Sequence, residues 1–254
     1  MFFKLERRWQ ILLVTIFLCL MASLYVLGIL FDFQWFWLHM AYPPWIIVDT
    51  LFYMTTVLCF VFMILLFRGT TRDMLMTLAF FFILIADFFL VRHTFIASFH
   101  GVGVTAFLIA QIFFMRRLHL NMSRKLQIID ISARGILTII GLAISIPLLW
   151  GQYTFLYFIT VIYLVNLVMN VFWGWTSPRN ILFALGLTFL LLCDIFVGLQ
   201  HRGYAWFEIW IPFNFAWAFY VPAKAFLVLS LLYQHTTRES TPITNRTRNI
   251  QLPS

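Results

Sequence analysis

The chain has 254 residues, of which 63% are hydrophobic and only 10% are charged. A soluble domain carries about 45–50% apolar and about 25% charged residues, so this composition excludes a soluble globular enzyme and a disordered chain. The net charge of +8 would suggest a nucleic-acid partner in a soluble protein, but in a membrane protein it first reports which loops face the cytoplasm. The stretch Ile11–Leu30 contains no charged residue and is long enough to cross a hydrocarbon core as a helix. The composition therefore indicates a polytopic membrane protein built of helices.

Charges, prolines and polar clusters divide the chain into eight apolar segments. We expect an all-α bundle of eight transmembrane helices, near residues 10–31, 44–67, 74–91, 97–115, 135–151, 153–175, 180–200 and 213–234. They form one transmembrane domain over residues 1–235, and the polar segment 236–254 is predicted to be a disordered cytoplasmic tail. The basic stretch 116–134 is predicted to be a loop that lies against anionic headgroups.

Lys and Arg residues are distributed unequally over the loops between these segments. With the N-terminus in the cytoplasm, 14 of the 17 fall on the cytoplasmic side, Arg92 and Arg202 fall outside, and Lys224 lies within the last segment. Cytoplasmic loops are enriched in Lys and Arg, so this split predicts that both termini are cytoplasmic. It accounts for the basic charge without a nucleic-acid partner. We expect the membrane to be a bacterial plasma membrane.

The third and seventh segments are similar around an aspartate. Aligned on Asp87 and Asp194, both have Phe five residues before and two residues after, and a small residue directly before. The segments that follow also pair, because Ala110-Gln111-Ile112-Phe113 is similar to Ala223-Lys224-Ala225-Phe226. An even number of helices in each half preserves orientation, so the pattern predicts a parallel repeat of four plus four helices with a site between the halves. The alternative is chance similarity between Phe-rich and Leu-rich helices.

Charged residues inside membrane segments are costly and commonly face a cavity or a partner. Asp49, Asp87 and Asp194 each lie near the outer end of a segment, and Lys224 lies near the middle of the last one. We expect Asp87 and Asp194 to approach each other in an outward-opening cavity as a catalytic pair, because their depth and context match. The alternative is that each aspartate only fixes helix packing through a polar neighbour. The residues expected to bind substrate are Gln111, Lys224, Asp49 and Asn166.

No metal and no cofactor are expected. The histidines show no HExxH spacing, and the three cysteines lie in apolar segments without ligand-like spacing. No Gly-rich phosphate loop and no GxSxG motif occur. The alternative is an interfacial metal site, as in seven-helix membrane hydrolases, formed by the aspartates with His93, His100 and His201.

Four stretches carry a family resemblance: Asp87, Gly101–Phe114, Gly186–Leu199 and Tyr220–Ser230. In that order they resemble the third-helix aspartate, the fourth helix, the seventh-helix aspartate motif and the last helix of the YhhN family of lysoplasmalogenase-like membrane proteins. The eight-helix layout and the length are also similar to that family. The sequence departs from the family pattern at Gln111, where the pattern has His, and at Lys224, where it has a neutral residue.

The resemblance implies hydrolysis of the 1-alkenyl ether bond of a lysoplasmalogen, a lysophospholipid, to a fatty aldehyde and a glycerophospho-alcohol. The residues are compatible with this reaction, because one carboxyl group can protonate the alkenyl β-carbon while another stabilises the oxocarbenium ion or activates water, as in glycosidases. Two other functions fit the same residues. One is a proton-coupled transporter or exporter that uses the aspartates as proton carriers, and the other is a non-catalytic membrane partner protein that docks through segment 116–134.

Overall fold

The computed structural model describes residues 7–38, 45–92, 98–148, 155–176, 181–201 and 215–239, and within these ranges it contains helices and no strand. This confirms the all-α architecture. Residues 240–254 of the predicted tail lie outside the described ranges. The helices are α1 (Arg7–Leu38), α2 (Trp45–Leu65), α3 (Thr71–Arg92), α4 (Ser98–His119), α5 (Arg124–Leu148), α6 (Phe155–Trp175), α7 (Ile181–His201) and α9 (Phe215–Glu239).

Seven of these helices are long and apolar enough to cross a membrane, whereas the apolar stretch of α9 is shorter and covers Ala216–Leu231. Large apolar side chains remain exposed on the outer helix faces; Ile139 of α5 and Phe155 of α6 are 68% and 76% exposed. Such a surface is unfavourable in water and suits a lipid environment. The chain is thus an integral membrane protein, while the count of eight spans stays a prediction.

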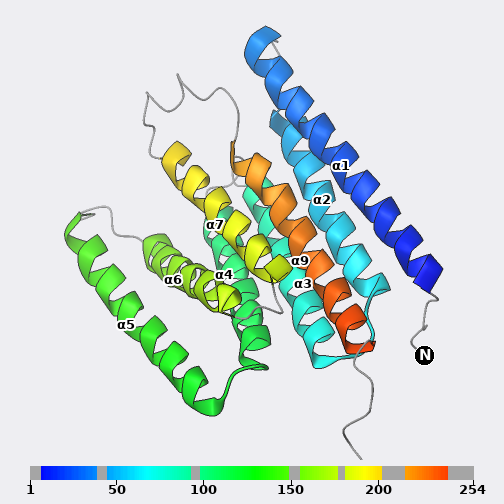
Figure 1. Cartoon of the computed structure of the whole chain (residues 1–254). Coiled ribbons are helices and arrows are strands. Elements are labelled where there is room, and N and C mark those ends of the chain that lie inside the picture. Colours follow the sequence, from blue (N-terminus) through cyan, green and yellow to red (C-terminus); the bar gives the residue numbers. More distant parts are fainter. Residues whose placement is uncertain are drawn as a thin grey trace, which may run out of the picture.

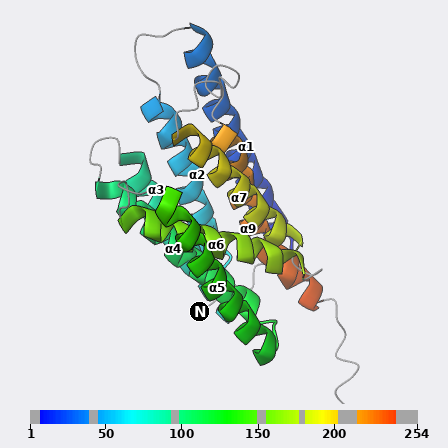
Figure 2. The ribbon, with the colours of Figure 1, turned by 90° about the vertical axis from the view of Figure 1, so that its left-hand side faces the viewer.

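Helices α1 and α5 lie on opposite flanks of the bundle, and α3, α4, α7 and α9 lie between them (Figure 1). Helix α1 packs on α2, and α5 packs on α6. The most extensive helix pairs are α3 with α4 and α7 with α9. The view turned by 90° shows α5 in front of α6 and α4 (Figure 2). The polar groups described below come mainly from the inner helices.

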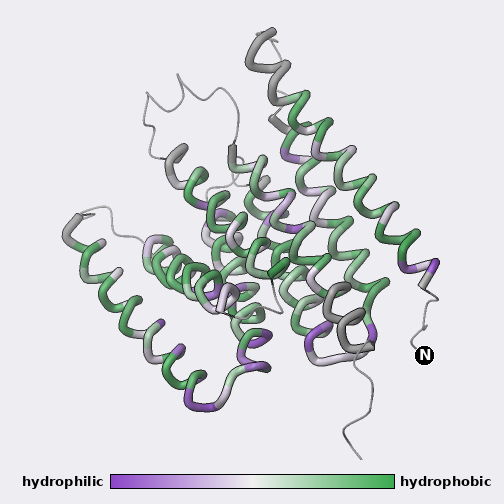
Figure 3. Tube along the Cα trace, in the orientation of Figure 1, coloured by the Kyte–Doolittle hydropathy of each residue, from purple (hydrophilic) through white to green (hydrophobic). Residues whose placement is uncertain are grey.

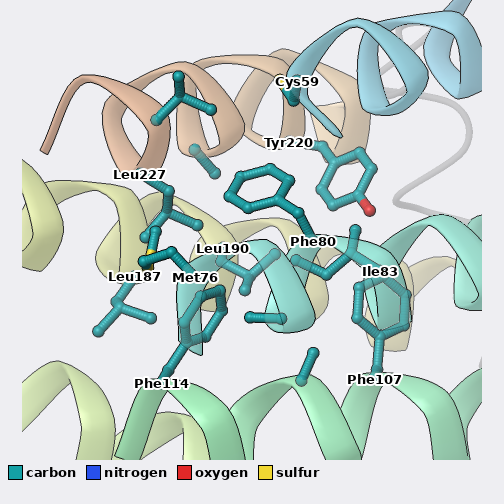
Figure 4. Close-up of a cluster of buried hydrophobic side chains, with 14 of the residues drawn as sticks. Cys59, Met76, Phe80, Ile83, Phe107, Phe114, Leu187, Leu190, Tyr220 and Leu227 are labelled. Carbon is teal, nitrogen blue, oxygen red and sulfur yellow. The ribbon is translucent and has the colours of Figure 1, made fainter. Parts of the chain in front are cut away.

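The centre of the bundle is an apolar core to which α3, α4, α7 and α9 all contribute (Figure 4). Close approach of α7 and α9 depends on Gly186, because a Cβ there would lie 2.7 Å from Cγ of Leu227 and 3.0 Å from the carbonyl oxygen of Ala223. Small residues of this kind commonly occur where membrane helices touch. The labelled core residues in Figure 4 are Cys59, Met76, Phe80, Ile83, Phe107, Phe114, Leu187, Leu190, Tyr220 and Leu227.

Polar residues gather at one end of the bundle, at the start of α1 and at the α2–α3 and α4–α5 turns (Figure 3). The end of α9 lies at this same end (Figure 1). Arg68 and Arg72 belong to the α2–α3 turn region, and Arg116, Arg124 and Lys125 flank the α4–α5 turn. We refer to this end as the basic end.

The predicted loop over residues 116–134, with a helix only from residue 135, is wrong. Helix α4 continues to His119 and α5 already begins at Arg124, so the connection is short and closed by backbone hydrogen bonds such as Met122 N to the carbonyl oxygen of His119 at 3.1 Å. Two of the charges that suggested a solvated loop are paired instead. Asp130 and Arg134 lie one turn apart on α5, form an ion pair and are both buried.

The α2–α3 turn is built from a glycine and a capping pair. Gly69 has a φ of 78°, a left-handed conformation that favours glycine. Thr70 Oγ1 accepts from the Asp73 amide at 3.2 Å, and Asp73 Oδ2 accepts from the Thr70 amide at 3.2 Å. This reciprocal pattern is a capping box, which satisfies donors at the start of α3.

Replacing the cap, Thr70→Ala, should lower the free energy of unfolding by about 1 kcal/mol, because an amide of the first turn of α3 loses its acceptor. Thermal or denaturant unfolding of the purified protein in detergent measures this. Thr160→Ala, which removes an exposed hydroxyl bonded only to the carbonyl oxygen of Leu156 within α6, is the matched control and should have a smaller effect. Equal stability of the Thr70→Ala variant and the unmodified chain would contradict the capping role.

Candidate functional site

Asp87 lies near the end of α3 and is buried against α2 and α9. Its Oδ1 accepts a hydrogen bond from the Tyr220 hydroxyl at 2.5 Å. Its Oδ2 accepts a hydrogen bond from the hydroxyl of Thr56. The Nζ atom of Lys224 lies 4.0 Å from the same Oδ2. Three helices thus bring a carboxylate, an ammonium and two hydroxyls together.

Lys224 is almost completely buried, with 1% of its surface exposed. Its Nζ donates to Thr55 Oγ1 at 2.6 Å, to Thr56 Oγ1 at 2.7 Å and to the carbonyl oxygen of Phe52 at 3.2 Å. It also stands 3.9 Å from the ring centroid of Tyr220, close enough for a cation–π interaction. An ammonium has three protons, so these acceptors satisfy it. Thr56 bridges Lys224 to Asp87.

Asp194 of α7 has different surroundings. It is half-buried, and its Oδ2 accepts a hydrogen bond from the hydroxyl of Tyr163 of α6. The ring of Phe107, on α4, lies 6.1 Å from the ring of Tyr163 and 6.3 Å from the ring of Tyr220. The two tyrosines that bind the two aspartates therefore flank one phenylalanine. A cavity between the aspartates stays a prediction.

A second polar cluster joins α4, α5 and α6 near the basic end. Asp130 is fully buried and accepts from Arg134 Nε at 2.9 Å and from the indole of Trp173 at 2.6 Å. Its Oδ2 also lies 2.6 Å from Nε2 of His119. The carboxylate thus meets groups from all three helices, which explains how a charged residue is accommodated inside the bundle.

This cluster extends from Arg134 toward the centre of the bundle. Arg134 donates through Nη1 to Asn166 Oδ1 and through Nη2 to Asn170 Oδ1, both at 2.9 Å. Nδ2 of Asn170 then donates to Oε1 and to the carbonyl oxygen of Gln111, again at 2.9 Å in each case. Asn166, Asn170 and Gln111 therefore belong to one chain of hydrogen bonds that starts at Asp130.

The predicted substrate-binding residues fall into different places. Lys224 joins Asp87, whereas Gln111 and Asn166 join the Asp130 cluster. Asp49 is half-buried in the second turn of α2.

The three histidines of the alternative metal site, His93, His100 and His201, are only partly described. His100 is half-buried near the start of α4, and His93 lies outside the described residues. In the part of the chain that the structure describes, no three His, Cys, Asp or Glu side chains are arranged to hold a metal ion.

Three hydroxyl partners of the aspartates were missed by sequence reasoning: Thr56, Tyr163 and Tyr220. Hydroxyl side chains are unremarkable in apolar helices, so hydropathy does not single them out. A usable signal is spacing, because Thr56 precedes Asp87 by 31 positions and Tyr163 precedes Asp194 by 31 positions. Asp130 and Arg134 were missed because they were assigned to a loop.

Comparison of the chain with protein-family models, with curated proteins and with solved structures finds no match. The resemblance to the YhhN family therefore stays a prediction that rests on the motifs themselves.

The Lys224–Asp87 pair gives a direct test of the geometry. Lys224→Met should lower the free energy of unfolding by about 3–5 kcal/mol, because it leaves the buried Asp87 carboxylate without its cation. Asp87→Asn in the same chain should restore part of that loss, and chemical unfolding of the two single variants and the double variant measures the coupling. Strictly additive effects would contradict a direct interaction between the two side chains.

Proposed function

We propose that this chain is a membrane hydrolase that cleaves the 1-alkenyl ether bond of lysoplasmalogens, with Asp87 and Asp194 as two carboxyl groups of unequal role. The observation that carries the proposal is the difference between their surroundings. Asp87 lies 4.0 Å from the ammonium of Lys224, whereas Asp194 is bonded to the neutral hydroxyl of Tyr163. Carboxyl pairs in unlike environments divide acid and base roles between them.

The neighbours of Asp87 and Asp194 indicate which one acts as the carboxylate and which one acts as the proton donor. An ammonium nearby, together with hydroxyl donors to both oxygens, stabilises Asp87 as a carboxylate. Asp194 is the residue of the pair that can bring a proton to the substrate. Both remain attached to rigid helices, and buried hydrogen bonds fix the geometry of each.

The reaction consumes one water and needs no cofactor. Asp194 donates its proton to the β-carbon of the alkenyl chain, and the electrons of the C=C bond form the new C–H bond. The oxocarbenium ion on the α-carbon and ether oxygen is stabilised by the Asp87 carboxylate, in the manner of a glycosidase. Water adds to the α-carbon and its proton returns to Asp194. The hemiacetal then breaks into a fatty aldehyde and a glycerophospho-alcohol.

A parallel repeat of four plus four helices is part of the proposal, and the helix contacts support it. The flanking helices α1 and α5 occupy matching places, α9 packs on α2, and α4 packs on α6. The Thr56–Asp87 and Tyr163–Asp194 hydrogen bonds span the same number of positions.

The central core also supports the repeat in the alignment set by the sequence. Phe80 matches Leu187 and Phe114 matches Leu227, and all four are buried in one cluster (Figure 4). Two matched pairs even contact each other, as expected near a two-fold axis. The ring of Phe107 contacts that of Tyr220, and Arg117 Nη2 donates to Ser230 Oγ at 3.0 Å.

The repeat explains why the two carboxyl groups differ. Tyr220, which donates to Asp87, is matched in the other half by Phe107, which carries no hydroxyl. Lys224 is matched by Gln111, which carries no charge. The residues that the repeat matches to Tyr220 and Lys224 on the Asp194 side therefore lack the two groups that stabilise a carboxylate at Asp87.

A proton-coupled transporter is the second candidate, favoured by the buried Asp87–Lys224 pair at the contact of α2, α3 and α9. Intramembrane ion pairs commonly mark proton and ion pathways, and Pro222 interrupts the hydrogen bonding of α9 two residues before Lys224. Substrate accumulation in sealed vesicles that depends on a pH gradient would favour this function over hydrolysis.

The proposed activity predicts a pattern across four variants. Asp87→Asn and Asp194→Asn should each lower kcat about 10²–10⁴-fold, because Asn keeps the size of the side chain but neither donates a carboxyl proton nor carries charge. Aldehyde release from a purified lysoplasmalogen measures this. His100→Ala and Thr160→Ala are controls that should retain most activity, and chelators should have little effect.

Three results would overturn parts of this proposal. Near-normal aldehyde release by both folded Asn variants would rule out the two-carboxyl mechanism. Loss of activity on chelation would make the aspartates metal ligands. No turnover of any 1-alkenyl lysolipid by the unmodified protein would leave the transporter as the better function.

We also propose that both termini lie in the cytoplasm of a bacterial cell, with the basic end facing inward. The Lys and Arg residues at that end support this orientation. In a chain whose native cysteines are replaced by serine, Lys4→Cys and Ser254→Cys should be labelled by a membrane-impermeant thiol reagent only after the membrane is opened. Arg202→Cys should be labelled in intact cells. Labelling of the two ends on opposite faces would refute the eight-span topology.

A further inference from the structure

Gln111 is fully buried on α4, and its neighbours fix the orientation of its amide. Both its carbonyl oxygen and its Oε1 accept from Nδ2 of Asn170 at 2.9 Å. Oδ1 of Asn170 is in turn occupied by Arg134, which is held by the Asp130 carboxylate. Arg134 can only donate, so it must bind the amide oxygen of Asn170, and the NH₂ group of Asn170 then faces Gln111. Gln111 can accept from that NH₂ group only with its own amide oxygen.

With this orientation, the chain of hydrogen bonds that starts at Asp130 ends at the NH₂ group of Gln111. Among the described residues, Nε2 of Gln111 has no acceptor. Buried donors in folded proteins nearly always have a partner, and leaving one without any is costly. An acceptor from outside the described protein residues, an ordered water or a bound molecule, is therefore expected at this NH₂ group.

The position of Gln111 places this donor on the Asp194 side of the bundle. Gln111 accepts from Asn170 of α6, the helix whose Tyr163 donates to Asp194. On α6, Asn170 follows Tyr163 by two turns, so both lie on the face that meets α4. The facing sides of α4 and α6 therefore carry the Gln111 amide and Tyr163, the residue that donates to the proposed proton donor Asp194.

The polar chain behind Gln111 is not a requirement of the helix packing. In the proposed repeat, Asn170 corresponds to Met63, which is buried in the apolar core of the other half. The residue matched to Gln111 is Lys224, whose donors are all satisfied by α2. Of these two matched positions, only Gln111 combines an oriented amide with an NH₂ group that lacks a protein acceptor in the described residues.

We infer that Gln111 is a substrate-binding residue whose Nε2 donates to the free hydroxyl at C2 of the lysolipid glycerol, held in place by Asp130, Arg134 and Asn170. An uncharged amide suits an uncharged oxygen, whereas a phosphate is better matched by a cation. The ether oxygen is the less suitable acceptor, because it must release electron density to the neighbouring carbon when the β-carbon is protonated. This inference rests on the proposed function, and it makes Gln111 the residue that selects lysolipids.

The test combines a residue change with a change in the substrate. Turnover of a 1-alkenyl lysolipid is compared with that of its 2-deoxy analogue, which lacks only the hydroxyl. The unmodified protein should prefer the hydroxylated substrate in kcat/KM at least tenfold, because sites built to bond a hydroxyl reject analogues that lack it. Gln111→Leu and Gln111→Met, which remove the NH₂ group and leave no polar atom in its place, should reduce that preference to less than threefold. Thr188→Val should keep the preference, because its half-buried hydroxyl on α7 donates only to the carbonyl oxygen of Ala184 and accepts from the indole of Trp175.

A structural role alone would lower turnover of both substrates equally, and an unchanged preference in the Gln111 variants would overturn the inference. Binding separates this result from failure of the proposed function. Saturated 1-alkyl lysolipids with and without the C2 hydroxyl cannot undergo the reaction, and their affinities are measured by the ligand-induced thermal shift of the purified protein. A hydroxyl preference that depends on Gln111 without any hydrolysis would uphold the binding role and refute the hydrolase. Equal affinity for both lipids, or no binding, would refute the role of Gln111.

Discussion

The constraint on which this structure depends is the cost of placing charge inside an apolar bundle. An isolated charged residue at the centre of a membrane helix costs about 2.5–3.5 kcal/mol on insertion scales. Two buried ion pairs satisfy this constraint, Asp87 with Lys224 and Asp130 with Arg134. Each draws its further partners from neighbouring helices, so the polar clusters also fix how those helices are placed against one another.

The apolar core separates the polar networks of the two aspartates. Phe107 and the core residues around it keep the two aspartates attached to separate networks, one ending at an ammonium and the other at a tyrosine hydroxyl. The proposed reaction needs this difference, because two equivalent carboxyl groups could not divide the roles of proton donor and carboxylate between them. In the proposed repeat, the departures from symmetry at Phe107 and Gln111 are therefore the informative positions for the proposed chemistry.

Hydropathy and charge were sufficient to predict the all-α membrane architecture, because helices that face lipid must be long and apolar. They also singled out Asp87, Asp194 and Lys224, since charges in such helices are rare. The tyrosine and threonine partners were not predictable, because a hydroxyl costs little to bury and its partner lies on another helix. The start of α5 was missed for a related reason: Asp130 and Arg134 are polar in sequence, and only their buried partners on α4 and α6 make them compatible with the bundle.

The attachment of α5 has a consequence for biogenesis. Helix α5 packs on α6, and its charged pair is completed by His119, which precedes it in the chain, and by Asn170 and Trp173, which follow it. A nascent α5 that leaves the ribosome alone would expose Asp130 and Arg134 to lipid without those later partners. We therefore expect α5 to enter the bilayer stably only together with α6, as a hairpin rather than one helix after the other.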